Sequence, residues 1–240
     1  MRRIITLLLF CALSVEGYAS EGVELQAANI DLSDKRSLQR GAKTFVTYCL
    51  GCHSLKYMRY KRLAQDFGLD EKKMLTQIAP QNASIYDKMF TAMNKHDAEK
   101  WFGIQPPDLS LIARSRGTDW LYTYLKGFYV DKSKPLGVNN AVFPDVGMPN
   151  VFWQLQGQQQ AVVNMVEGKQ IVEGLVLDKP GTLSEKEFDD LVNDLVNFLA
   201  YVGEPMQLER VSLGKYVLLY LFMFLGIAYV LKKEYWKDVH

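Results

Sequence analysis

The five residues Cys49–His53, which read Cys-Leu-Gly-Cys-His, constrain this chain more than any other feature. Two cysteines three positions apart, with a histidine directly after the second, form the pattern of covalent c-type haem attachment. In that chemistry Cys49 and Cys52 each form a thioether to a haem vinyl group, and His53 binds the iron as its proximal ligand. Gly51 lets the backbone pass close to the macrocycle. The motif therefore predicts one covalently bound haem c.

Two other uses of a cysteine pair fit the chain less well. A zinc site needs a second pair of ligands, and a thioredoxin-like dithiol opens the helix of a βαβ unit, which the pattern around Cys49 does not indicate. The third cysteine, Cys11, lies in a segment with a basic start, a short apolar run over 4–13 and small residues at its end. These features predict a signal peptide over 1–19. The exported chain then keeps only the haem-binding pair, and no disulfide is expected.

The C-terminal segment carries no charge from Tyr216 to Leu231. Extended to 211–231 it gives about 21 residues, or roughly 31 Å of helix, which is enough to cross a bilayer. Lysines follow this span, as expected at a cytoplasmic end. A buried hydrophobic helix is the alternative, and it is disfavoured because the segment is apolar on every face. We therefore predict a periplasmic domain over 20–210, one helix across the bacterial inner membrane, and a cytoplasmic tail over 232–240.

The charge balance excludes little. The formal net charge is +1, with 28 Lys and Arg against 27 Asp and Glu. Nothing in this balance indicates nucleic-acid binding. A locally acidic surface would still be able to steer a basic partner.

Two helices are expected at the ends of the exported domain. Apolar residues with helical spacing from Leu38 to Val46 predict a helix that runs into the haem motif. The capping box 184–187, followed by an apolar stripe over 188–199, predicts a second helix that ends near Gly203.

We expect these two helices to pack against each other, with Gly41 and Phe45 at the crossing. Helix is expected to dominate the whole domain. The glycine- and proline-containing stretches 103–107 and 134–149 are expected to be loops.

A six-coordinate electron-transfer haem needs a second axial ligand. Met148 is the favoured candidate, because it follows Gly147 between two prolines in a stretch that cannot form a regular helix. Methionine ligation also raises the reduction potential of a haem. His96 is the weaker alternative, because it lies in the polar run 94–99, which is typical of a solvated helix face. The remaining candidate methionines are expected to fill the core: Met58, Met74, Met89, Met93, Met165 and Met206.

The segment Pro106–Gly117, which reads PPDLSLIARSRG, resembles a characteristic segment of the cytochrome c1 family. The stretch after the haem motif and the order of all the features resemble that family as well. The resemblance covers essentially the whole mature chain. It implies a mainly α fold, namely a class I cytochrome c-like haem domain with loop insertions plus one C-terminal transmembrane helix.

The same resemblance implies roles for individual residues. Met148 is the distal ligand, and Arg114 lies beside a haem propionate, although a surface salt bridge is the ordinary alternative for an arginine. The carbonyl of Pro106 or Pro107 accepts a hydrogen bond from the His53 ring and increases its basicity. Two aromatic residues either line the haem pocket or belong to an ordinary core: Trp120 and Tyr124.

In function, the resemblance implies a membrane-anchored monohaem electron carrier of quinol–cytochrome c reductase. It would take electrons from the Rieske iron–sulfur subunit and pass them to a c-type cytochrome, in a dimeric complex that also contains cytochrome b. The protein would perform no bond chemistry itself, because the cofactor carries the electron. A monohaem subunit of a terminal oxidase or another membrane dehydrogenase is the first alternative, and a haem-based sensor is the second.

Two departures from the family concern partner docking. The segment between Leu63 and Trp101 is shorter than in mitochondrial relatives, and Lys61 stands where an arginine is common there. A basic run interleaved with tyrosines either docks a partner or forms a solvated helix face: Lys56, Tyr57, Arg59, Tyr60, Lys61 and Arg62.

Overall fold

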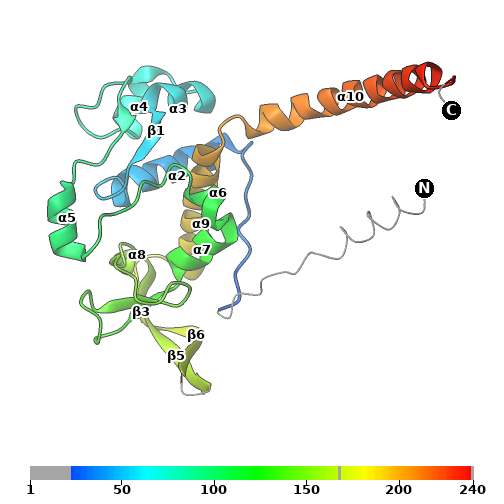
Figure 1. Ribbon diagram of the computed structural model, residues 1–240. Helices are drawn as coiled ribbons and strands as arrows, with labels where there is room; N and C mark the ends of the chain where they lie inside the picture. The colour runs from blue at the N-terminus through cyan, green and yellow to red at the C-terminus, as the bar shows by residue number, and fades with distance from the viewer. Residues whose placement is uncertain (1–22, 167–168, 239–240) are drawn as a thin grey trace.

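The computed structural model describes residues 23–166 and 169–238, which form a mainly helical domain and a long C-terminal helix that leaves it (Figure 1). The predicted signal peptide lies outside the described residues. The helices are α2 (Lys35–Tyr48), α3 (Tyr60–Phe67), α4 (Glu71–Gln77), α5 (Lys95–Phe102), α6 (Ile112–Arg116), α7 (Thr118–Lys126), α8 (Trp153–Gln156), α9 (Glu185–Gly203) and α10 (Gln207–Tyr235). The strands form three antiparallel pairs: β1 (Leu55–Arg59) with β2 (Lys88–Met89), β3 (Phe128–Val130) with β4 (Val138–Asn140), and β5 (Gly157–Val166) with β6 (Lys169–Pro180).

The centre of the domain is the crossing of α2 and α9, as the sequence predicted (Figure 1). Gly41 lies so close to α9 that a Cβ atom there would stand 2.1 Å from the backbone oxygen of Asp194. Beside it the rings of Phe45 and Phe198 pack with their centroids 5.9 Å apart, and both side chains are fully buried. The missing side chain at Gly41 therefore lets two helix backbones meet and close the core.

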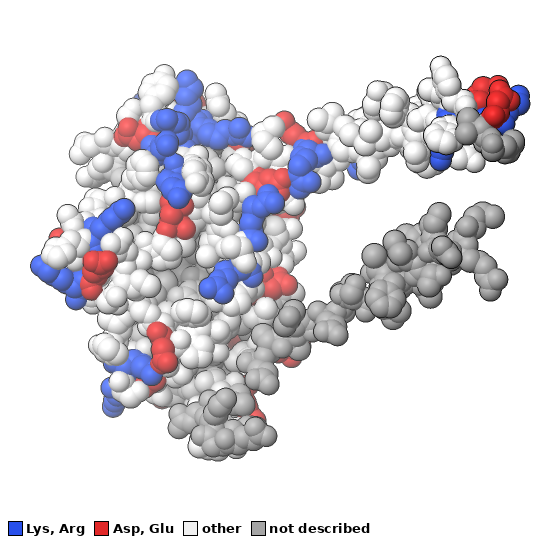
Figure 2. Space-filling view, in the orientation of Figure 1, with Lys and Arg blue, Asp and Glu red and all other residues white. Residues whose placement is uncertain are grey.

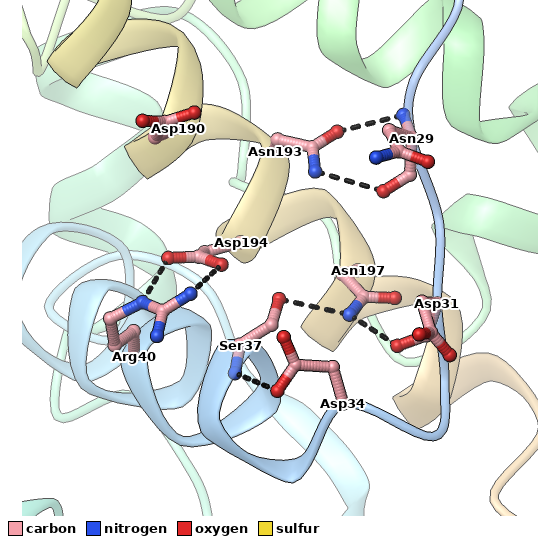
Figure 3. Close-up of a pocket in the computed structure, with 9 residues that line it drawn as sticks. All are labelled: Asn29, Asp31, Asp34, Ser37, Arg40, Asp190, Asn193, Asp194 and Asn197. Atoms are coloured by element: carbon pink, nitrogen blue, oxygen red, sulfur yellow. Dashed lines mark hydrogen bonds and ion pairs between the residues drawn. The ribbon is translucent and has the colours of Figure 1, made fainter.

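Polar side chains line one edge of this crossing (Figure 3). Arg40 of α2 donates two hydrogen bonds to the Asp194 carboxylate, at 2.5 and 2.8 Å. The buried amide of Asn197 donates to the Asp31 carbonyl and to the Ser37 hydroxyl, at 2.8 and 2.9 Å. These contacts hold the segment before α2 against α9, so the position of the helix along its partner is specified as well as its angle.

Side chains cap both helices. Asp34 accepts hydrogen bonds from the backbone of Arg36 and Ser37 at the start of α2. The predicted capping box of Ser184 and Glu187 is present at the start of α9. At its other end α2 stops at the first cysteine of the haem motif, so the motif begins where this core helix ends.

The long β5–β6 hairpin was not predicted, and it projects from the domain in Figure 1. It is stabilised at its base, where the Gln159 amide donates to the carbonyls of Lys126 and Phe128 at 2.8 and 2.9 Å. Much of its apolar surface is exposed. Its sequence therefore lacks the regular alternation of apolar and polar residues that marks a strand packed on a core. The stretch 134–149, expected to be a loop throughout, also contains the short strand β4.

Helix α10 has 29 residues, and its most apolar window is not buried at all within the described structure. It is long and apolar enough to cross a membrane. It begins at Gln207, four residues before the predicted span, and continues to Tyr235. The helix therefore extends beyond the predicted apolar span at both ends.

Gly41→Ala is expected to lower the free energy of unfolding by about 1–3 kcal/mol, because the added methyl group forces α2 and α9 apart. This loss should exceed the gain of about 1 kcal/mol that alanine brings to a helix. Thermal unfolding of the purified, haem-loaded protein would show a fall in Tm of about 2–4 °C for each kcal/mol.

Gly214→Ala is the matched control, because a Cβ there meets nothing within 4 Å in the described structure. Equal effects of the two substitutions on Tm would contradict the close approach of the helices at Gly41.

Candidate haem-binding site

The haem motif forms a tight turn at the end of α2. The backbone N–H of Cys52 donates to the Cys49 carbonyl at 3.0 Å, and that of His53 donates to the same carbonyl at 2.8 Å. Cys49 is buried, Cys52 is half-buried, and both thiols are free. Burial raises the pKa of Cys49 to about 12, so its sulfur is uncharged at neutral pH. A buried, neutral sulfur suits a thioether, which carries no charge.

The ring of His53 is oriented by a single backbone group. Its Nδ1 lies 2.8 Å from the carbonyl oxygen of Pro107, and the side chain is buried. Because a carbonyl only accepts hydrogen bonds, Nδ1 carries the hydrogen and the lone pair of Nε2 is free to bind a metal. Burial lowers the pKa of His53, which favours this neutral form. Of the two predicted prolines, Pro107 therefore makes the contact.

Asp108 positions the Pro107 carbonyl. Its carboxylate accepts hydrogen bonds from the backbone N–H groups of Lys56 and Ser110, at 2.9 and 3.0 Å. The backbone N–H of Leu109 donates to the Ser54 carbonyl at 2.9 Å. These bonds join the Pro-Pro-Asp-Leu-Ser segment to the residues directly after the haem motif. Sequence reasoning missed this role of Asp108, because nothing in a single sequence shows which backbone groups a carboxylate faces.

The predicted distal ligand, Met148, lies in an irregular loop and is half-buried. The hydroxyl of Tyr124 donates to its sulfur at 3.3 Å. A thioether sulfur has two lone pairs, so one remains for an iron. A Cβ atom at Gly147 would stand 3.1 Å from the side chain of Ile104, so this loop packs on the segment that leads to Pro107. One short segment thus contacts the loop of one predicted ligand and the ring of the other.

Two buried asparagines hold the Met148 loop in place. Asn140 accepts hydrogen bonds from the backbone of Val142 and Phe143, at 2.9 and 3.1 Å, and donates to the Tyr124 carbonyl at 2.8 Å. Asn139 accepts from the backbone of Asp145 at 2.8 Å. The loop is therefore fixed by side-chain amides in addition to its prolines, which were the signal in the sequence.

Tyr124 is part of an aromatic group on α7 and β3. Its ring stacks on Trp120 with the centroids 4.9 Å apart, and it meets the ring of Phe128 edge-on at 5.3 Å. Burial raises the pKa of Tyr124, so its hydroxyl stays protonated and able to donate to Met148. Both aromatic residues that the sequence singled out therefore lie together beside the Met148 loop.

Arg114 makes a salt bridge. Its guanidinium Nη1 lies 2.7 Å from Glu204, just after α9, and its side chain is 56 % exposed. Glu204 also pairs with Arg210 of α10. These two cations lower the pKa of the Glu204 carboxyl, Arg210 having the larger effect. A contact of Arg114 with a haem propionate stays a prediction.

The other candidate ligands have other surroundings. His96 lies exposed near the start of α5, as a solvated helix face predicts. Met58, Met74 and Met89 are buried in the core as expected. Met165 and Met206, expected in the core, are instead 60 % and 45 % exposed, because they lie on the hairpin and before the C-terminal helix.

Comparison with known proteins identifies the family of the chain. The model of the Cytochrome C1 family matches residues 27–239. The chain belongs to the cytochrome c1 family. It is therefore a haem c electron carrier of the cytochrome bc1 complex, whose other subunits include cytochrome b and the Rieske protein. Its C-terminal apolar helix fits the membrane anchor of such a subunit.

Individual relatives cover most of the chain. It is 53 % identical to cytochrome c1 of Allochromatium vinosum, over 91 % of each chain. It is 48 % identical to a Nitrosomonas europaea protein called ammonia monooxygenase gamma subunit, over the whole of both chains. It is 29 % identical to cytochrome c1 of Rhodospirillum rubrum, over 86 % of this chain and 83 % of that one.

Tyr124→Phe is expected to lower the midpoint potential of the cytochrome c1 haem. The hydroxyl withdraws electron density from the Met148 sulfur. With Met148 as the predicted ligand, loss of the hydroxyl would make the sulfur a better donor to oxidised iron. A hydrogen bond worth about 0.5–1.5 kcal/mol corresponds to roughly 20–60 mV for a one-electron couple. Redox titration followed by visible absorption measures the shift.

Tyr122→Phe is the control on the same helix, because the Tyr122 hydroxyl contacts Lys126. A potential that is unchanged in Tyr124→Phe, or that rises, would show that this hydroxyl does not act on the iron ligand.

Proposed function

We propose that this chain binds one haem c through thioethers to Cys49 and Cys52, with His53 and Met148 as the axial ligands of the iron. The main support for this proposal is the orientation of the His53 ring. Its Nδ1 faces the Pro107 carbonyl at 2.8 Å, which leaves the lone pair of Nε2 to bind the iron. The haem supplies reversible one-electron chemistry at its iron. The protein positions the two ligands, keeps His53 neutral and shields it from water. The crossing of α2 and α9 supports a class I cytochrome c-like core.

The proposed role is electron relay in quinol–cytochrome c reductase. The haem receives electrons from the Rieske subunit and gives them to a c-type cytochrome, and no side chain of this protein breaks or forms a bond. The domain lies in the periplasm and α10 crosses the inner membrane once, in a dimeric complex. Lys232 and Lys233 in the last turn of α10 support a cytoplasmic C-terminus. Arg114 beside a propionate belongs to the same proposal.

Met148→Ala is the direct test of the sixth ligand. It should convert the reduced haem from a low-spin form that does not bind carbon monoxide into one that binds it rapidly. Met165→Ala is the control, because that methionine is 60 % exposed on the hairpin and should leave the spectrum unchanged. Rapid carbon monoxide binding by the unaltered protein would rule out Met148 as a ligand.

Isolation from membranes tests the assembly. We expect the chain to co-purify with cytochrome b and an iron–sulfur subunit, and its haem to be reduced by quinol in that preparation. Co-purification with a terminal oxidase in their place would favour the alternative of an oxidase subunit.

A further inference from the structure

We propose that an exposed, positively charged face beside the haem motif docks an electron acceptor whose surface is acidic. This inference rests on the proposed function, because it assumes that the bound haem passes electrons to a separate carrier. The basic face, as we call it, lies on β1, β2, the adjoining turns and the first turn of α3. It consists of four cations and three aromatic residues: Lys56, Arg59, Lys61 and Lys88, with Tyr57, Tyr86 and Phe90.

The first part of the basic run is a strand and not the helix face considered above. Residues 55–59 form strand β1, and helix α3 begins after it, at Tyr60. Tyr60 is buried, whereas Tyr57 is 64 % exposed. Arg62 is paired with Asp66 at 2.5 Å and does not belong to the basic face. The other cations of the run are Lys56, Arg59 and Lys61. Lys88 of the neighbouring strand β2 stands opposite Arg59 in the sheet.

The four cations of this face outnumber the two carboxylates beside it, Asp87 and Asp108. Among the residues that the structure describes, none of its four cations forms an ion pair with a carboxylate. Asp87 accepts a hydrogen bond from the backbone of Ser84 at 2.8 Å, and Asp108 is held by backbone groups. Figure 2 shows blue side chains gathered over the region of β1, α3 and α4. An acidic protein would therefore be attracted to this region.

The cations are combined with exposed aromatic rings. The ammonium groups of Lys56, Lys61 and Lys88 lie 5.0, 4.7 and 5.8 Å from the ring centroids of Tyr57, Tyr86 and Phe90. Tyr86 and Phe90 are 59 % and 57 % exposed. Aromatic residues are enriched at protein interfaces, because a rigid ring buries a large area at little entropic cost. The rings offer contact area that a purely solvated basic surface lacks.

The basic face is connected to the haem motif through neighbouring residues. The hydroxyl of Thr91, next to Phe90, donates to the Gly51 carbonyl at 2.7 Å. The backbone N–H of Lys56 donates to Asp108, which follows the proline that contacts His53. A carrier docked here would bring its cofactor close to the haem, as electron transfer requires.

The composition indicates a transient partner. Lysine is depleted at the centres of stable interfaces, whereas charged surfaces that meet a partner of opposite charge mainly increase the association rate. A mobile carrier must bind and leave at every turnover. We therefore assign the basic face to a soluble acidic carrier and not to a permanent subunit of the complex.

The experiment uses the purified intact complex with its haem reduced chemically before mixing. Stopped-flow absorption follows oxidation of the haem by two small c-type cytochromes, one of net negative and one of net positive charge. In Lys56→Glu/Lys88→Glu the second-order rate constant for the negative carrier at low salt should fall by about tenfold or more. That for the positive carrier should rise. The control variant Lys132→Glu/Lys179→Glu makes the same charge change on the hairpins. In it the rate constants for both carriers should stay within about twofold of those of the unaltered complex.

The other outcomes overturn the inference. An unchanged rate with the negative carrier, or an equal fall with both carriers, means that charge on this face does not select the acceptor. Slower reduction of the haem by quinol in the same variant, with oxidation unaffected, would assign the face to the Rieske subunit. Failure of quinol to reduce the haem in the unaltered complex would instead refute the proposed function, which the chemically reduced assay does not depend on.

Discussion

The contact of α2 and α9 at Gly41 is the constraint on which the rest of the structure depends. Because α2 ends directly at Cys49, its position on α9 determines where the haem motif stands. Full burial of Phe45 and Phe198 contributes about 1.5–3 kcal/mol each, and the two hydrogen bonds between Arg40 and Asp194 fix the register. A shift of α2 along α9 would move His53 away from the Pro107 carbonyl.

The same helix connects the haem-binding domain to the membrane helix. Glu204 follows α9 directly and pairs both with Arg114, which follows the Pro-Pro-Asp-Leu-Ser segment, and with Arg210 of α10. Exposed pairs of this kind contribute little to stability. Their geometric effect is larger, because one carboxylate between two guanidinium groups restricts the angle between the domain and its anchor. The orientation of the haem relative to the membrane therefore depends on the end of α9.

The sequence predicted the elements that depend on local chemistry. Helical spacing and the Ser184 capping box identified α2 and α9, and flanking prolines identified the Met148 loop. Strand β1 was missed because its register shifts between Leu55 and Arg59. Leu55 and Met58 are therefore both buried, at a spacing of three that imitates a helix.

Other features have no signature in one sequence. The β5–β6 hairpin leaves much of its apolar surface exposed, so it lacks the alternation that marks a strand on a core. Pro106 and Pro107 were indistinguishable because the group that acts is a backbone carbonyl. Asn140 and Asp108 act on backbone groups of loops that are distant in sequence or irregular, which only the folded chain brings together.

The two proposed iron ligands are acted on in opposite directions. The Pro107 carbonyl accepts from His53 and makes the imidazole a stronger donor, which stabilises oxidised iron. The Tyr124 hydroxyl donates to Met148 and makes the sulfur a weaker donor, which stabilises reduced iron. The first effect depends on Asp108, which holds the segment of Pro107 in place. The second depends on Asn140, which holds the Met148 loop against the Tyr124 backbone. With these two ligands, the reduction potential would depend on how firmly two loops are held, and Lys56 of the basic face is hydrogen-bonded to one of them through Asp108.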